Sequence, residues 1–92
     1  MTTSTTKTGH DHYRNAVALR DLIVAGQSNQ PALKAWVEVC RACARANDAY
    51  RAEFSARSGG RGYTRFELSQ LDNLERVWWT ARAQVETRTR AN

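Results

Sequence analysis

The sequence predicts an all-α protein built as a long antiparallel helical hairpin with a shorter helix before it. The chain is rich in alanine and arginine, and it has a single proline and five glycines. Apolar residues recur at alternating steps of three and four over two long stretches, and no stretch alternates with a period of two. A chain of 92 residues makes one small domain, which often needs a partner to bury its remaining apolar surface. We therefore expect a three-helix unit over 10–90 that dimerises as a helical bundle, after a disordered polar tail over 1–9.

The first helix is expected over about 10–25. Thr8 and Asp11 have the spacing of a capping box, in which each residue binds the backbone amide of the other. Gly26 is the expected end of this helix, because glycine readily takes the left-handed backbone conformation that closes a helix. The residues GQSN then form a short connection to the next helix.

A second, longer helix is expected over about 31–57. Pro31 suits its first turn, where a missing amide hydrogen costs nothing. The residues expected to face inward are Leu33, Trp36, Cys40, Cys43, Asn47, Tyr50 and Phe54. Asn47 is the polar member of this seam. It either fixes the register of the helices, as asparagines do in coiled coils, or lies at a wet edge. The residues SGGRGY end the helix.

A third helix is expected over about 64–87, opened by a second capping box of Thr64 and Glu67. Its inward positions are Glu67, Leu71, Leu74, Trp78, Ala81 and Val85. The two long helices are each roughly 37 Å long at about 1.5 Å per residue. Because they have equal lengths and a short glycine-rich loop joins them, they are expected to pair as an antiparallel hairpin. In that hairpin Trp36 is expected opposite Val85.

The motif CRAC, from Cys40 to Cys43, lies in the middle of the second helix and in its apolar seam. A redox dithiol normally begins a helix that follows a strand, and no strand is predicted before this motif. A zinc site would need two more ligands, and the only histidines, His10 and His12, lie beside the polar tail. We expect both cysteines to pack in the core as small apolar side chains, with zinc as a weaker alternative and no cofactor.

The formal net charge of +5 comes from arginine, with twelve arginines against two lysines. A basic surface favours anionic partners, so direct DNA or RNA binding is the alternative function. The arginines expected to carry it are Arg41, Arg45, Arg57, Arg61 and Arg65. The stretch GGRG has the spacing of the loop that clamps nucleic acid in KH domains, but no three-stranded sheet is predicted here. These glycines are therefore interpreted as the connector of the hairpin.

Two adjacent tryptophans, Trp78 and Trp79, point to a contact surface. Neighbouring helical residues point about 100° apart, so one seam cannot hold both rings. With Trp78 in the seam, Trp79 is either covered by the first helix or left partly exposed. Partial exposure would give this region the tryptophan, tyrosine and arginine composition of binding hot spots. The predicted partner-binding residues are Trp79, Arg76, Arg82, Tyr63 and Phe66.

These patterns predict a small non-enzymatic binding module. The sequence contains no nucleophile elbow, phosphate loop, dinucleotide fingerprint or metal-binding helix motif, and no small-molecule substrate is expected. The module is expected to act stoichiometrically, by docking on a protein partner or by forming a homodimer. Accessory, regulatory or inhibitor roles, of the kind carried by phages and plasmids, suit such a chain. With two cysteines and no long apolar stretch, it is expected in the cytoplasm and not in a membrane.

Overall fold

The chain folds into three helices. The structure, a computed structural model, describes residues 7–27, 31–59 and 61–91. Its helices are α1 (Gly9–Val24), α2 (Ala32–Ser58) and α3 (Arg65–Ala91). These described parts of the chain contain no strand, so the all-α prediction is confirmed for them. Within the same residues, none of the helices has an apolar stretch long enough to cross a bilayer.

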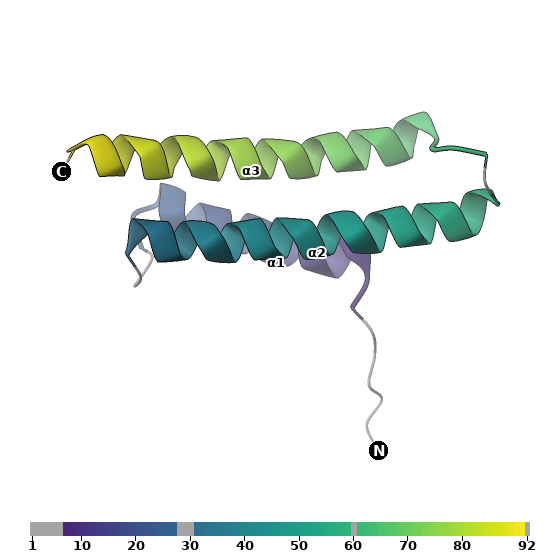
Figure 1. The fold of residues 1–92 in the computed structure, drawn as a ribbon, viewed down its shortest axis with the longest axis horizontal. Helices are drawn as coiled ribbons and strands as arrows, with labels where there is room; N and C mark the ends of the chain where they lie inside the picture. Colours follow the sequence, from purple (N-terminus) through teal and green to yellow (C-terminus); the bar gives the residue numbers. More distant parts are fainter. Residues whose placement is uncertain (1–6, 28–30, 60, 92) are drawn as a thin grey trace, which may run out of the picture.

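The helices form two layers of unequal length. In Figure 1, α2 and α3 lie side by side and run in opposite directions, and α1 lies behind them. The start of α1 is fixed to α2, because the amide of Gly9 donates to the carboxylate of Glu53 at 2.7 Å. Its end is fixed to α3, where the guanidinium of Arg88 donates to the carbonyl of Ile23. With 16 residues against 27 in each of the others, α1 covers one side of the α2–α3 pair only in part.

The predicted capping box at the start of α1 is confirmed. The hydroxyl of Thr8 accepts from the amide of Asp11 at 3.2 Å, and the Asp11 carboxylate accepts from the amide of Thr8 at 3.1 Å. Hydrogen bonding to Thr8, first of all from its amide, lowers the pKa of the Asp11 carboxyl. The predicted tail boundary is wrong at Gly9, which is buried as the first residue of α1. The predicted disorder of residues 1–6 lies outside the described residues.

Glycine and a second capping box set the other helix ends. Gly26 and Gly59, which follow α1 and α2, have φ angles of 72° and 60°, in the left-handed region that favours glycine. At the start of α3, the amide of Thr64 donates to the Glu67 carboxylate at 2.9 Å, and the Glu67 amide donates to the Thr64 hydroxyl at 3.1 Å. Pro31 is the N-cap of α2 and lies just before its first helical residue, Ala32. It was predicted to lie inside the first turn of the helix.

The deepest core of α2 lies on a different stripe from the predicted seam. Four small residues are buried there: Ala35, Val39, Ala42 and Ala46. The stripe continues to Tyr50, whose ring lies against Gly9, so it faces α1. In the predicted seam Cys43, Tyr50 and Phe54 are buried, Trp36, Cys40 and Asn47 are half-buried, and Leu33 is 65% exposed. The inward prediction for Leu33 is wrong, because α2 packs on two helices and its buried arc is centred between them.

The predicted seam of α3 is largely buried. Glu67, Leu74, Ala81 and Val85 are buried, and Leu71 and Trp78 are partly buried. Val77 was not predicted to face inward, yet it is only 1% exposed, because α1 also packs on α3. The ring of Trp36 contacts the ring of Trp78, with 5.0 Å between centroids. The predicted pairing of Trp36 with Val85 did not include this contact, since long aromatic side chains reach beyond the residue directly opposite.

Candidate functional site: the open face of α2 and α3

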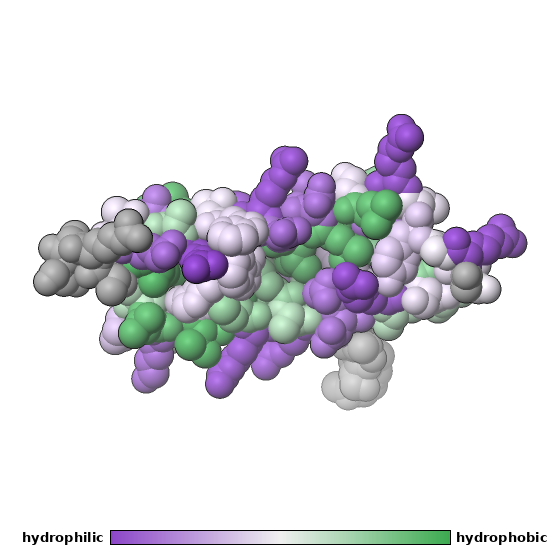
Figure 2. Space-filling view, turned by 45° about the horizontal axis from the view of Figure 1, so that its top comes forward, coloured by the Kyte–Doolittle hydropathy of each residue, from purple (hydrophilic) through white to green (hydrophobic). Residues whose placement is uncertain are grey.

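A shallow groove runs between α2 and α3. Its volume is about 860 Å³, and the residues that line it come from α2, α3 and no other described helix. Its walls include Cys40, Ala44 and Asn47 of α2 and Leu68, Leu71 and Trp78 of α3. Figure 2 shows apolar side chains, in green, in separate patches, with hydrophilic side chains, in purple, between them and projecting from the edges. We call this side the open face, because α1 packs behind the pair (Figure 1).

The open face continues along α2 as an exposed apolar stripe. Leu33 is 65% exposed and Val37 is 43% exposed. Steps of four, three and four lead from Leu33 through Val37 and Cys40 to Ala44, so the four residues share one side of the helix. Adjacent exposed apolar side chains often mark a contact site. The stripe therefore extends the groove toward the start of α2.

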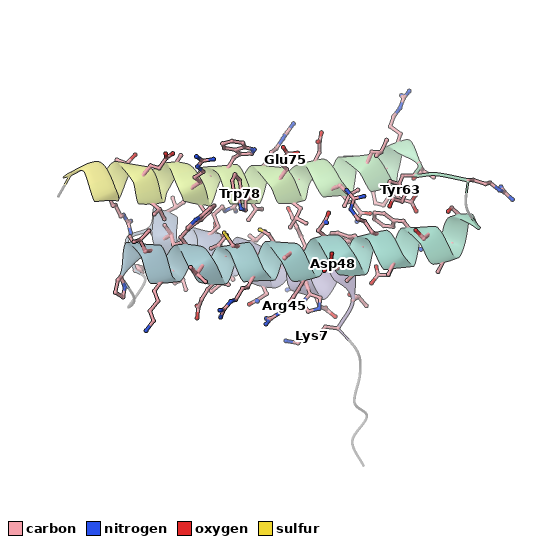
Figure 3. The ribbon with its side chains drawn as sticks, viewed as in Figure 1. Lys7, Arg45, Asp48, Tyr63, Glu75 and Trp78 are labelled. Carbon is pink, nitrogen blue, oxygen red and sulfur yellow. The ribbon has the colours of Figure 1, made fainter. Side chains whose placement is uncertain are left out.

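Trp79 stands at the α3 edge of the open face. Of the two alternatives raised by the sequence, the structure has the partly exposed one, with 52% of the residue accessible. The indole N–H of Trp79 donates to the carboxylate of Glu75 at 3.4 Å. Its ring meets that of Trp78 edge to face, with 4.9 Å between centroids and 88° between planes. In Figure 3, Trp78 is directed toward α2 and Glu75 lies on the outer side of α3.

Arg82 places a cation over both tryptophans. Its guanidinium carbon lies 5.5 Å from the ring centroid of Trp78 and 5.2 Å from that of Trp79. Contacts of this kind contribute about 0.5–1 kcal/mol each at exposed sites. The Arg82 Nε also lies 3.8 Å from the carboxylate of Glu86. Glu75, Trp78 and Arg82 together fix the Trp79 ring while leaving about half of it accessible.

The other predicted partner-binding residues are divided between two places. Arg76 lines a small surface hollow together with Trp79. Tyr63, in contrast, packs on the ring of Phe54, with 5.8 Å between centroids, near the connector between α2 and α3. Phe66 is 69% exposed, but on an ideal helix it points about 140° away from Trp79. Tyr63 and Phe66 thus belong to the tip of the α2–α3 pair and not to the open face.

The two cysteines of CRAC are free thiols in the wall of the groove. The core prediction is confirmed for Cys43, which is buried, while Cys40 is half-buried. Burial, and then the nearby Cys40, raises the pKa of the Cys43 thiol from 9.0 to about 11. Such a thiol is protonated near neutral pH, so it is a poor nucleophile and a poor metal ligand.

His10 and His12, the remaining members of the zinc alternative, lie in the first turn of α1. The ring of His10 stacks on that of Tyr13 at 6.3 Å between centroids. In the part of the chain that the structure describes, no three His, Cys, Asp or Glu side chains are grouped to hold a metal ion. The structure therefore does not bring these histidines together with Cys40 and Cys43.

Asn47 lies at the edge of the groove and is half-buried. Its side-chain oxygen accepts a hydrogen bond from the Nε of Arg51, one turn later in α2, at 3.1 Å. This partner belongs to the same helix, so the bond does not tie α2 to α3. The local bond supports the wet-edge alternative over a role in register.

The arginines of the nucleic-acid alternative fall into two groups. Arg41 and Arg45 line a hollow of about 300 Å³ between α1 and α2. Arg57, Arg61 and Arg65 lie at the tip, at the end of α2, in the connector and at the start of α3. Arg45 and Arg57 are about 18 Å apart along α2 and about 120° apart around it. The five side chains therefore do not share one face of the molecule.

Comparisons with protein-family models, with curated proteins and with solved structures find no match to this chain. Among the residues of the open face, Leu33, Val37 and Leu68 were missed by sequence reasoning as contact candidates. Leu33 was placed in the core seam, and the other two lie beside a seam. Their helical spacing from Cys40 and Trp79 was the available signal, but it identifies a shared side without showing that the side is exposed.

Proposed function

We propose that this chain is a non-enzymatic helical module that docks on a protein partner, in a fixed stoichiometry, through the open face. The α2–α3 hairpin is the docking element, and the partner contributes amphipathic helices. Such helices bind in hydrophobic grooves by placing apolar side chains at every third or fourth position. The observation that supports the proposal is Trp79, half-exposed and held in place by Glu75 and Arg82. Glu75 also lines the groove between α2 and α3, whose wall mixes apolar and polar side chains.

A fixed aromatic ring is well suited to binding. Ordering a free side chain at an interface costs about 0.5–1.5 kcal/mol, and contacts within the chain already hold the Trp79 ring. Tryptophan is also enriched among residues that dominate binding energies. The opposite side of the α2–α3 pair shows how completely a docked helix can be buried. There α1 packs on the pair, and its Ala16 and Ile23 are 0% and 2% exposed. A partner helix on the open face would meet Cys40, Leu71 and Trp78 in the same way.

Docking of this kind serves accessory, regulatory or inhibitor roles, in which a small chain occupies or holds a surface of a larger assembly. We place the protein in the cytoplasm, where thiols such as those of Cys40 and Cys43 stay reduced. Two free thiols near each other on one helix suit a reducing compartment better than an oxidising one.

The proposal is tested by site-specific photo-cross-linking in an extract of the native cells. One protein carries the photoreactive residue in place of Leu68, on the open face, and a matched control carries it in place of Leu22, on α1. These positions are 52% and 42% exposed. We expect the first protein to form one adduct of defined mass, linked through an amphipathic helix, and the control to form none.

Competition identifies the surface that is used. Unlabelled wild-type protein should suppress the adduct, and unlabelled Trp79→Ala protein should do so about a hundredfold less well, as for a hot-spot residue. Circular dichroism of the variant should show unchanged helicity. Equal adducts from both positions, or equal competition by the Trp79→Ala protein, would contradict docking through the open face.

A further inference from the structure

On the basis of the function proposed above, we infer that the partner on the open face is a second copy of this chain. The two copies are related by a two-fold axis that runs parallel to α2 and α3. In this arrangement α2 of each copy packs on α3 of the other, which makes a four-helix core with the two α1 helices outside it. Apolar residues on the open face of one copy then contact apolar residues of the other, and residues of opposite charge face each other.

The height of Trp79 along the pair is set by the aromatic contact between the two long helices. The Trp36 and Trp78 rings lie 5.0 Å apart, and the Trp79 ring lies 4.9 Å from that of Trp78. The Trp79 ring therefore lies within about 10 Å of the Trp36 ring, near the part of α2 that carries Val37. Both Trp79 and Val37 are about half exposed, at 52% and 43%.

A two-fold rotation about an axis parallel to the helices keeps this height unchanged. It brings Trp79 of each copy onto Val37 of the other, beside Leu33, which is 65% exposed. Two equivalent contacts of an aromatic ring with aliphatic side chains result. They bury the large apolar residues that a single copy leaves in water, which is the main driving force for association.

The charges beside these residues are opposite in sign. Glu75 lies one turn from Trp79 on α3. Arg41 lies one turn from Val37, at the outer edge of α2 next to the α1–α2 hollow that it also lines, and both residues are exposed. The step from Trp79 to Glu75 leads toward the start of α3, and the step from Val37 to Arg41 leads toward the end of α2. Because α2 and α3 run in opposite directions, both steps go the same way along the pair and end at the same height. Glu75 of each copy therefore faces Arg41 of the other, so the contact forms twice in the dimer.

A two-fold axis across the helices does not give this complementarity. It would pack α2 on α2 and α3 on α3, with an antiparallel alignment about the middle of the groove. Asp72 of one copy would then lie close to Asp72 of the other. Like charges at an interface cost free energy, so the charges select the axis parallel to the helices.

The basic residues near the tip fit the same arrangement. Arg51 is engaged within its own chain, where its Nε donates to Asn47 and its guanidinium lies 5.9 Å from the Tyr63 ring centroid. Asp48, one turn earlier, is exposed and labelled on α2 in Figure 3. It lies within about one turn of the height of Arg65 in the second copy.

The open face is large enough for a stable dimer. Helices of 27 residues are about 40 Å long, and two helices side by side are about 20 Å wide, so the face covers about 800 Å². Stable protein interfaces bury about 800 Å² on each partner. The second copy therefore accounts for the whole exposed side of the pair.

Light-scattering mass of the purified full chain, over about 1 to 100 μM, tests the inference. The wild type is expected to have the mass of two chains, and Trp79→Ala should weaken the dimer about a hundredfold or more. Leu22→Ala on α1 is the matched control and should leave the mass unchanged. Circular dichroism checks that each variant keeps its helices.

Charge exchange tests the axis. Glu75→Lys and Arg41→Glu should each weaken the dimer by about tenfold or more, since each places like charges together twice. The double variant with both changes should return to within about threefold of the wild type, because opposite charges face each other again. An equal mixture of the two single variants should form mixed dimers for the same reason.

The outcomes separate this inference from the proposed function. A single-chain mass over the whole range, with a Trp79-dependent adduct to another protein, overturns the second copy and leaves the docking function intact. A dimer that Trp79→Ala does not weaken overturns the second copy on the open face, and equal competition by the Trp79→Ala protein in the cross-linking experiment overturns the docking function. Failure of the double variant to recover overturns the pairing of α2 with α3.

Discussion

The adjacent residues Trp78 and Trp79 have different environments, because neighbouring side chains on a helix point about 100° apart. Trp78 turns toward α2 and meets Trp36, while Trp79 stays half in water at the rim of the groove. Glu75 and Arg82 lie one turn to either side of Trp79 and hold its ring through the indole N–H and the π face. One side chain thus completes the contact between two helices, and the next is available to a partner.

At the same scale, burial of Cys43 predicts slow thiol chemistry. A rise in the pKa of this thiol from 9.0 to about 11 lowers its thiolate fraction at pH 8 about a hundredfold. In Cys40→Ser protein, where burial alone still raises the pKa of Cys43, this thiol should react with a thiol reagent more slowly when folded than in denaturant. The complementary Cys43→Ser protein retains the half-buried Cys40 and should react faster when folded. Equal rates in the two folded variants would contradict the burial of Cys43.

The same raised pKa fixes the direction of a pH effect on stability. The protonated thiol is favoured in the folded state, so its contribution is fully present below pH 9.0 and is lost as pH rises toward about 11. Thermal unfolding of the wild type should therefore shift to lower temperature over this range by more than that of Cys43→Ala protein.

At the scale of the element, α1 is held on the pair by its two ends. The amide of Gly9 donates to Glu53 of α2, and Arg88 of α3 donates to the carbonyl of Ile23. Between the ends, small residues of α2 such as Ala42 and Ala46 are buried at 1% and 0% exposure and let the two backbones approach closely. Docking of α1 therefore depends on the absence of bulk along this contact.

Gly9→Ala tests that dependence. A Cβ at this position would lie 2.5 Å from the Tyr50 Cδ1. The Tyr50 ring is 3% exposed and stacks on Phe54 at 5.4 Å, so it has little room to move. We expect the free energy of unfolding, measured in urea, to fall by about 1–3 kcal/mol, as for other overpacked sites. The control is His10→Ala, at the exposed neighbouring position. Unchanged stability of the Gly9 variant would show that the start of α1 is loosely docked.

At the scale of the whole molecule, the three helices leave the two sides of the α2–α3 pair unequal. One side carries α1, and the other presents the groove. Leu33, Val37 and Trp79, outside the groove itself, are exposed at 65%, 43% and 52%. Cores of small proteins bury a limited fraction of their apolar surface, and association with a partner extends that burial. The proposed dimer applies this principle to the open face.

Direct DNA or RNA binding, the alternative function, is also tested at the scale of the whole molecule, because it depends on the combined charge of many arginines. Mixed-sequence duplex DNA should bind the wild type only weakly, with a Kd above about 10 μM at about 200 mM salt, and Trp79→Ala should not change it. Tight binding that weakens about a thousandfold between about 50 and 200 mM salt would favour the arginines as the working surface. Its loss on replacing Arg57, Arg61 and Arg65 by alanine would assign that binding to the tip.

The sequence by itself determined the fold class and those helix ends that local capping groups set, while α3 continues to Ala91, beyond its expected end near residue 87. Thr8 with Asp11, and Thr64 with Glu67, form their capping hydrogen bonds within three residues, so the chain encodes them locally. Gly26 ends α1 for a similarly local reason, its φ of 72°. These features do not depend on what packs against the helix.

Only the tertiary structure decided which side of each helix is buried. The heptad pattern of α2 favoured Leu33 as a core residue, yet Leu33 is 65% exposed and the small Ala46 is fully buried. The difference arises because α1 packs on the alanine stripe, and burial depends on where a neighbouring helix lies. For the same reason the sequence could raise both fates of Trp79 but could not choose between them. In the structure α1 lies behind the pair, and Trp79 is 52% exposed.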